Sequence, residues 1–183
     1  MSSRPARLAA AAAAPLLALA LASCGSDDAA TPGAATDIEV TTPTAVPEEE
    51  FEVKDVDDVT TDKIAGQKVD DPGMDLAYVW QGTSSAPGGG TVVVVAVTNK
   101  SDVPMPADAL GQPNLTYTSG GNNKESARLM SAEDAQINPV GLDMPLGPGA
   151  TVNLKYPFSV SMTNLWDAQF TIGNVTFEGN LNN

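Results

Sequence analysis

The feature that most constrains the fold is a run of six consecutive apolar residues at 92–97, of which five are valine. Valine is branched at Cβ, and such side chains fit a pleated strand better than a helix. The run does not alternate with polar residues, so other parts of the protein must cover both faces of the strand. Turn-forming residues stand on either side, at 88–90 and 99–102. The sequence therefore predicts a central strand in a two-layer structure.

A second strand is predicted over residues 152–160 by the clearest alternation in the chain. The side chains expected to share its buried side are Val152, Leu154, Tyr156, Phe158 and Val160. Pro157 lies on the opposite side and has no N–H to donate to a neighbouring strand. We therefore expect this strand to lie at an edge of its sheet or to carry a bulge at Pro157.

Further strands are expected at 74–81, at 114–118 with Tyr117 inward, and at 169–177. Gly173 followed by asparagine suits the turn of a hairpin within the last of these segments. Trp166 just before it is expected to close the end of the core. Ser131 is expected to cap a short helix, because acidic residues follow it.

Together these signals give about seven short strands and no long helix. They predict an all-β fold, an antiparallel immunoglobulin-like β-sandwich over residues 72–183. About 110 residues are enough for one domain with one core. A small open barrel is the alternative.

Residues 1–23 have the features of a secretory signal peptide. Arg4 and Arg7 precede an apolar run, and small residues stand before Cys24. The run is too short and too rich in alanine for a membrane span. Leu-Ala-Ser-Cys at 21–24 resembles the lipobox of bacterial lipoproteins, which implies that Cys24 carries the lipid, with acyl chains such as palmitate. An ordinary signal peptide that contains a cysteine is the alternative, although Cys24 is the only cysteine in the chain and can form no intrachain disulfide.

Residues 24–71 are predicted to be an acidic, disordered linker behind the lipidated cysteine. Residues 25–75 hold 15 of the 23 acidic residues and three of the nine basic ones, and their few apolar residues show no period. A spacer is the favoured interpretation, and an acidic arm that binds cations or a partner is the other. Residues 51–56 do alternate, so they are expected either to add an edge strand or to dock on a partner. Nucleic acid is excluded as a partner by the small number of lysines and arginines.

Catalytic motifs are not found in the sequence. The chain contains no histidine, which removes Ser-His-Asp and Cys-His schemes and the usual histidine-based zinc and copper sites. Glu133 and Asp134 are adjacent acids that can in principle act on a glycan, but acids in a polar stretch are normally only solvated. The sequence therefore predicts a protein that is not an enzyme and that needs no cofactor.

Two sets of residues are weighed as metal ligands. Thioethers are ligands for Cu(I), and the candidates are Met105, Met130, Met144 and Met162. Oxygen ligands for Ca²⁺ are offered by Asn99, Asp102, Asp108 and Asp143. Core methionines and turn-forming acids are the favoured interpretations of both sets.

Two segments carry a resemblance to a known family. The valine-rich strand ends in Asn-Lys-Ser-Asp, and Leu-Gly-Pro-Gly-Ala-Thr-Val precedes a strand ending in Tyr-Pro-Phe-Ser-Val. Over residues 90–180 this pattern is similar to actinobacterial and firmicute envelope lipoproteins with an uncharacterised immunoglobulin-like domain, related to secreted immunogenic antigens of mycobacteria. The resemblance implies the sandwich fold and an exported location, and it brings no catalytic residues.

The function expected from the sequence is a binding or accessory module of the cell envelope, lipid-anchored on the extracytoplasmic face of the membrane and without catalysis. Its expected partners are the membrane, through Cys24, and an envelope protein or wall polymer. The alternative is an extracytoplasmic carrier of a small ligand or of a metal, Cu(I) or Ca²⁺, on the same sandwich.

Overall fold

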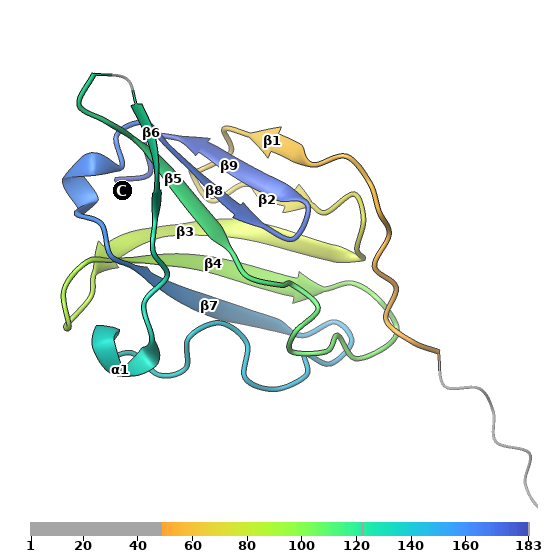
Figure 1. Cartoon of the computed structure of the whole chain (residues 1–183). Coiled ribbons are helices and arrows are strands. Elements are labelled where there is room, and N and C mark those ends of the chain that lie inside the picture. Colours follow the sequence, from red (N-terminus) through yellow and green to blue (C-terminus); the bar gives the residue numbers. More distant parts are fainter. Residues whose placement is uncertain (1–48, 122, 183) are drawn as a thin grey trace, which may run out of the picture. The chain divides into compact units, whose positions relative to one another are not determined.

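The computed structural model describes residues 49–121 and 123–182, and in this part of the chain it shows two β-sheets packed face to face (Figure 1). One sheet has the strand order β2-β3-β4-β7 and the other β1-β9-β8-β5-β6. The strands are β1 (Val59–Thr61), β2 (Lys68–Asp70), β3 (Leu76–Ser85), β4 (Thr91–Asn99), β5 (Asn114–Ser119), β6 (Asn123–Ala127), β7 (Thr151–Phe158), β8 (Ala168–Ile172) and β9 (Val175–Gly179). Two single-turn helices, α1 (Ala132–Ala135) and η1 (Met162–Asn164), lie in the connections. The predicted β-sandwich is confirmed, with nine strands and one parallel pair, β1 with β9.

The valine run forms β4, which lies inside its sheet between β3 and β7 as predicted. Val93, Val95 and Val97 are fully buried in the core between the sheets. The other face is covered too, because Val92 packs there with Met130 and the helix residue Ala135. A strand buried on both faces explains why this run is apolar at every position.

The alternating segment forms β7, the edge strand of the four-stranded sheet. The carbonyl oxygens of Lys155 and Pro157 point away from β4 and accept hydrogen bonds from the amides of Gly141 and Met130, at 2.9 and 2.8 Å. The ring nitrogen of Pro157 therefore also faces outward, where the sheet needs no donor. The predicted edge position is confirmed.

Aromatic rings hold the two sheets together. The ring of Trp80 on β3 lies 5.9 Å from that of Phe170 and 5.6 Å from that of Phe177, on β8 and β9. Phe158 on β7 meets Phe170 edge to face, with ring centroids 6.1 Å apart. Offset and edge-to-face pairs of this kind each add about 0.5–1.5 kcal/mol to the burial of the rings. The core thus joins both sheets without a disulfide.

The predicted start of the domain at residue 72 is wrong, and so is the prediction of a disordered linker as far as residue 71. Residues 59–61 pair with β9 and residues 68–70 pair with β3. Thr61 and Val69 are buried by this pairing. β1 gains its order from a distant partner and β2 from the following strand, and the local polarity of the segment reveals neither pairing.

Residues 51–56, expected to form an edge strand or to dock on a partner, form no strand. The side chain of Phe51 packs against the core of the same domain, and the amide of Lys54 donates to the carbonyl of Gly73 at 2.8 Å. This segment is therefore part of the sandwich domain. Residues 1–48, with Cys24 and the predicted signal peptide, lie outside the described residues.

Three smaller expectations also have outcomes. Ser131 caps α1 as predicted, its hydroxyl accepting from the amide of Asp134 at 3.0 Å. Trp166 does not close the core, because its side chain is 57% exposed and Leu165 takes the buried position. Tyr117 is only partly buried, and its hydroxyl donates to Glu125 on β6 at 3.0 Å.

Candidate functional site

A pocket of about 640 Å³ lies at one end of the sandwich, where the β3–β4 hairpin turns and β7 ends. We call it the hairpin pocket. Its lining consists of Ser85, Gly88, Gly89, Gly90, Met130, Ser159, Val160, Ser161, Met162 and Thr163. None of these side chains is charged, although the whole chain has a formal charge of −14. The pocket offers hydroxyl groups, thioethers and glycine backbone.

One wall is formed by the glycine turn between β3 and β4. Gly90 has φ +82°, and a Cβ at this position would collide with the carbonyl of Phe158 and approach the sulfur of Met130 to 3.1 Å. Only glycine both adopts a positive φ readily and fits where there is no room for a Cβ. The amide of Gly88 donates to the carbonyl of Ala135 at 3.1 Å, which fixes the turn against α1.

The facing wall is the chain that leaves β7. The buried hydroxyl of Thr91, the first residue of β4, donates to the carbonyl of Val160 at 2.7 Å. The amide of Ser159 donates to the carbonyl of Arg128 at 2.9 Å. The hydroxyls of Ser161 and Thr163 are bonded to each other at 2.9 Å. Both walls are therefore held by hydrogen bonds within the protein, and the site is largely preformed.

Of the four methionines weighed as copper ligands, the structure brings Met130 and Met162 to this pocket. The hydroxyl of Ser85 donates to the sulfur of Met162 at 3.6 Å. Met105 is fully buried beside Leu146, close to the opposite end of β4, and Met144 is 67% exposed. The proposed cluster of four methionines is therefore wrong, because the two ends of the sandwich separate its members.

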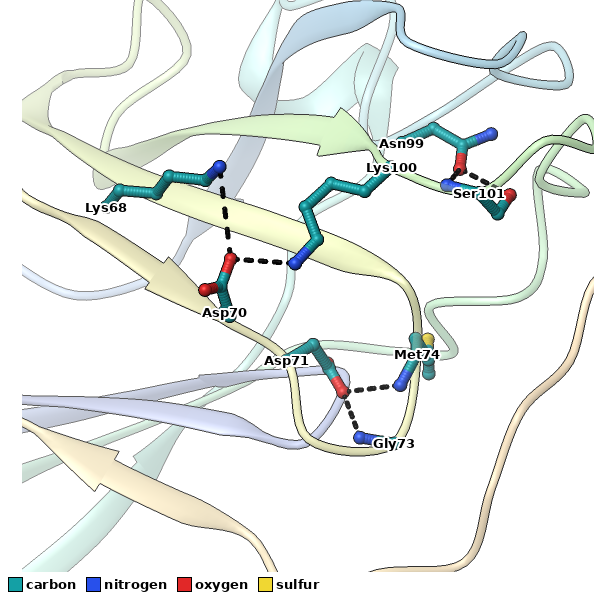
Figure 2. A network of polar contacts seen from close by, with 8 residues as sticks. All are labelled: Lys68, Asp70, Asp71, Gly73, Met74, Asn99, Lys100 and Ser101. Carbon is teal, nitrogen blue, oxygen red and sulfur yellow. Dashed lines mark hydrogen bonds and ion pairs between the residues drawn. The ribbon is translucent and has the colours of Figure 1, made fainter.

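The calcium candidates do not form a site either. The side-chain nitrogen of Asn99 donates to the carbonyls of Val103 and Leu146. Its side-chain oxygen accepts from the amide and hydroxyl of Ser101, as Figure 2 shows. Asp102, Asp108 and Asp143 are exposed in separate turns. Within the described ranges, no three acidic or cysteine side chains gather where a metal ion could bind. Asn99 thus has the turn-forming role that the sequence favoured.

Glu133 and Asp134, the adjacent acids weighed for catalysis, both lie on α1. Glu133 and Asp134 stand in the first turn of the helix and are exposed. Neither side chain lines the hairpin pocket. Their position suits the N-terminal end of a helix, where negative charge is favourable.

The opposite end of the sandwich carries a buried carboxylate, which we call the Asp71 clasp. Oδ1 of Asp71 accepts from the amides of Gly73 and Met74 at 2.8 and 2.9 Å and from the side-chain amide of Asn174 at 2.8 Å. Oδ2 accepts from the hydroxyl of Tyr78 at 3.0 Å and from the amide of Asn174 at 3.1 Å. Figure 2 shows Asp71 with the two amides of its own turn. One carboxylate thus fastens the β2–β3 turn to the β8–β9 turn of the other sheet.

The clasp has a marked effect on Tyr78. Burial raises the pKa of its hydroxyl well above the usual value, and the negative charge of Asp71 raises it further. The neighbouring Asp70 lies on the surface, where a hydrogen bond from Lys100 at 3.0 Å lowers the pKa of its carboxyl (Figure 2). Two successive aspartates therefore have opposite environments.

The sequence analysis missed the clasp because Asp71 was assigned to the end of the linker. The signal was nevertheless present. Asp71-Pro72-Gly73 is typical of a turn in which the carboxylate accepts from amides two and three residues on. The contact with Asn174, 103 residues away, has no such local signal.

The described chain begins at the clasp end. Glu49, Glu50 and Phe51 line a depression together with Val103 and two prolines in the loop after β4. The hairpin pocket lies beyond the first residue of β4, and this depression lies beyond its last. A strand of nine residues spans about 27 Å. The chain therefore enters the domain at the end opposite the pocket.

Comparisons with family models, with curated proteins and with solved structures give no match for this chain. The resemblance to envelope lipoproteins stays a prediction. In the described part of the chain, neither α1 nor η1 has the length or the apolar character to cross a membrane. The site is accordingly interpreted from its own geometry.

Proposed function

We propose that this protein is a binding or accessory module of the cell envelope, lipid-anchored on the extracytoplasmic face of the membrane and acting without catalysis. The observation that carries the proposal is the placement of the hairpin pocket about 27 Å from the end where the chain enters, by the length of β4. The pocket thus lies at the end of the domain opposite residues 49–51.

The anchoring part rests on the sequence of residues 1–24. A charged start, an apolar run and Leu-Ala-Ser-Cys support export and lipidation at Cys24. Stable anchoring needs more than one acyl chain, which the resemblance to lipoproteins supplies. The chemistry of the pocket supports binding rather than catalysis, because hydroxyls and thioethers without a neighbouring base are poor nucleophiles.

The anchoring is tested by Cys24→Ala in the full chain. We expect the variant to be released from the membrane fraction and to keep its fold, because the strands of the sandwich lie within residues 59–179. Fractionation followed by washing with high salt and carbonate measures the release. Retention of the variant on washed membranes would mean that another segment holds the protein there.

The binding role is tested by capture from envelope extract with the full Cys24→Ala chain as bait. Repeated enrichment of one envelope protein or of wall polymer supports the module. Failure to retain any envelope component in extracts prepared with and without detergent would contradict it. Denatured bait is the control for adhesion to exposed apolar surface.

A second candidate, a carrier of Cu(I), is favoured by one observation, the meeting of Met130 and Met162 in one pocket. Ligand binding would raise the melting temperature by mass action. A rise with Cu(I) that disappears in Met162→Leu supports the carrier. Met144→Leu, at an exposed position, is the control and should keep the rise. An equal rise in wild type and Met162→Leu would show that this pocket does not hold the ion.

A further inference from the structure

The hairpin pocket has a lining that selects for an uncharged ligand. Burying a charge beside groups that cannot neutralise it is costly, and no charged side chain lines this pocket. An adjoining hollow, which shares Ser85 with this pocket, is lined by Lys155. The chain as a whole is strongly acidic, so the neutrality is a local property.

The hydrogen-bonding groups of the pocket are of one kind. Ser85, Ser159, Ser161 and Thr163 each bring a hydroxyl. The hydroxyl of Ser85 donates to the sulfur of Met162, and those of Ser161 and Thr163 are bonded to each other, but each keeps capacity to accept a hydrogen bond from a ligand. A ligand with many hydroxyls or acetamido groups can match such a surface in several arrangements. Carboxylate and phosphate ligands are typically bound by arginine or lysine, and neither side chain lines this pocket.

The apolar part of the lining is also suited to a ring with hydroxylated edges. Met130 and Met162 lie in the pocket with Val160, and thioether side chains adapt to irregular apolar surfaces. A pyranose ring has an apolar C–H face and a polar rim, which fits thioethers flanked by hydroxyls. The volume of about 640 Å³ lies within the range of small-molecule sites, about 300–1,000 Å³.

From these contacts we propose that the hairpin pocket binds a short, uncharged oligosaccharide. The inference rests on the proposed function of an envelope-binding module and names the ligand class of its site. The hydroxyls of the chain that leaves β7 bond the polar rim of the sugar, and the two methionines contact its C–H face. The glycine turn admits the ring because Gly89 has open space where a side chain would stand.

The experiment uses the full chain purified in detergent, with methionine methyl groups labelled for NMR. The probes are chitotriose and cellotriose, both uncharged. We expect the methyl signals of Met130 and Met162 to shift in a saturable way and those of Met105 and Met144 to stay in place. Because no charge lines the pocket, the dissociation constant should change less than twofold between 50 and 500 mM NaCl.

A blocking variant separates this pocket from other surfaces. Ser159→Trp places a large side chain into the pocket at an exposed position and should weaken binding at least tenfold. Ser126→Trp, at an exposed position of β6, is the matched control and should leave binding unchanged. Absence of any methyl shift with millimolar probe, or equal affinity in Ser159→Trp and wild type, would overturn the proposal.

Co-sedimentation with purified cell wall distinguishes this failure from that of the proposed function. If wild type and Ser159→Trp sediment equally with the wall, the pocket assignment is wrong and the envelope-binding role stands. If wild type neither sediments nor captures an envelope component, both are wrong. Loss of sedimentation in Ser159→Trp alone supports both.

Discussion

The two ends of the sandwich differ in their polar groups and in their packing. At the clasp end a buried carboxylate accepts five hydrogen bonds and ties two sheets together. At the other end the hairpin pocket has no charged side chain in its lining, and Gly89 leaves open space beside it. The comparison teaches that this domain concentrates its specific bonding where the chain enters and leaves space at the far end. Rigid support on one side and an accessible site on the other is a common requirement for binding.

The largest effect on stability is expected from a substitution of Asp71 at the clasp end. Asp71→Ala leaves buried amide donors of Gly73, Met74 and Asn174 without an acceptor, and we expect a loss of about 3–5 kcal/mol in the free energy of unfolding. Urea unfolding followed by tryptophan fluorescence measures it. The matched control is Asp70→Ala, one residue earlier and exposed. Similar losses in both variants would show that the clasp is not special.

At the pocket end the corresponding change is Gly90→Ala. The added methyl group meets the carbonyl of Phe158 in a conformation with positive φ, so we expect a loss of about 2–4 kcal/mol. Gly89→Ala, with positive φ and open space around it, should lose only about 1–2 kcal/mol. Thermal unfolding of the pair separates crowding from backbone strain. Equal losses would mean that the wall of the pocket yields.

Unfolding at alkaline pH measures how much a buried tyrosine between the two ends contributes to stability. Burial raises the pKa of Tyr156 to about 12, from an ordinary value of 10. Its stabilising effect is therefore complete below pH 10, the unfolded pKa, and is lost as the pH rises towards 12. We expect Tyr156→Phe to remove about 1 kcal/mol of the stability lost between pH 9 and pH 11. If wild type and variant lose the same free energy of unfolding between pH 9 and pH 11, the effect does not come from Tyr156.

The smallest effect is expected on the surface at Asp70. The bond from Lys100 lowers the pKa of this carboxyl, so its contribution is present above about pH 4 and is lost as the pH falls further. Exposure and salt screening limit it, and Asp70→Asn should change stability by less than about 1 kcal/mol at pH 7. Measurements at 50 and 500 mM NaCl check this, because any effect should shrink with salt. A larger loss would place Asp70 within the clasp.

Strands could be predicted from the sequence where the signals that specify them are local. β4, β7 and the β8–β9 hairpin were predictable, because valine content, alternation and Gly173 are local signals. β1 and β6 are short and polar. β6 forms a local hairpin with β5, but the pairing of β1 with β9 is set by residues more than 110 positions away. The start of the domain was misplaced for this reason.

The same distinction applies to the site. The glycine turn was predictable as a turn, but the pocket also needs the chain after β7, whose place depends on pairing across the sheet. Methionine content suggested soft ligands, yet Met130 reaches the pocket through the bond of its amide to the carbonyl of Pro157, which has no local signal. Exposure of Trp166 was likewise decided by a competing residue, Leu165.

The entry of the chain at the clasp end has a mechanical consequence. A pull on residue 49 would reach first the bond from the amide of Lys54 to the carbonyl of Gly73, and next the bond from the amide of Val59 to that of Asn174. Both acceptors belong to turns that the carboxylate of Asp71 holds. Tension applied at residue 49 would thus reach the clasp before the hairpin pocket, which lies beyond the other end of β4.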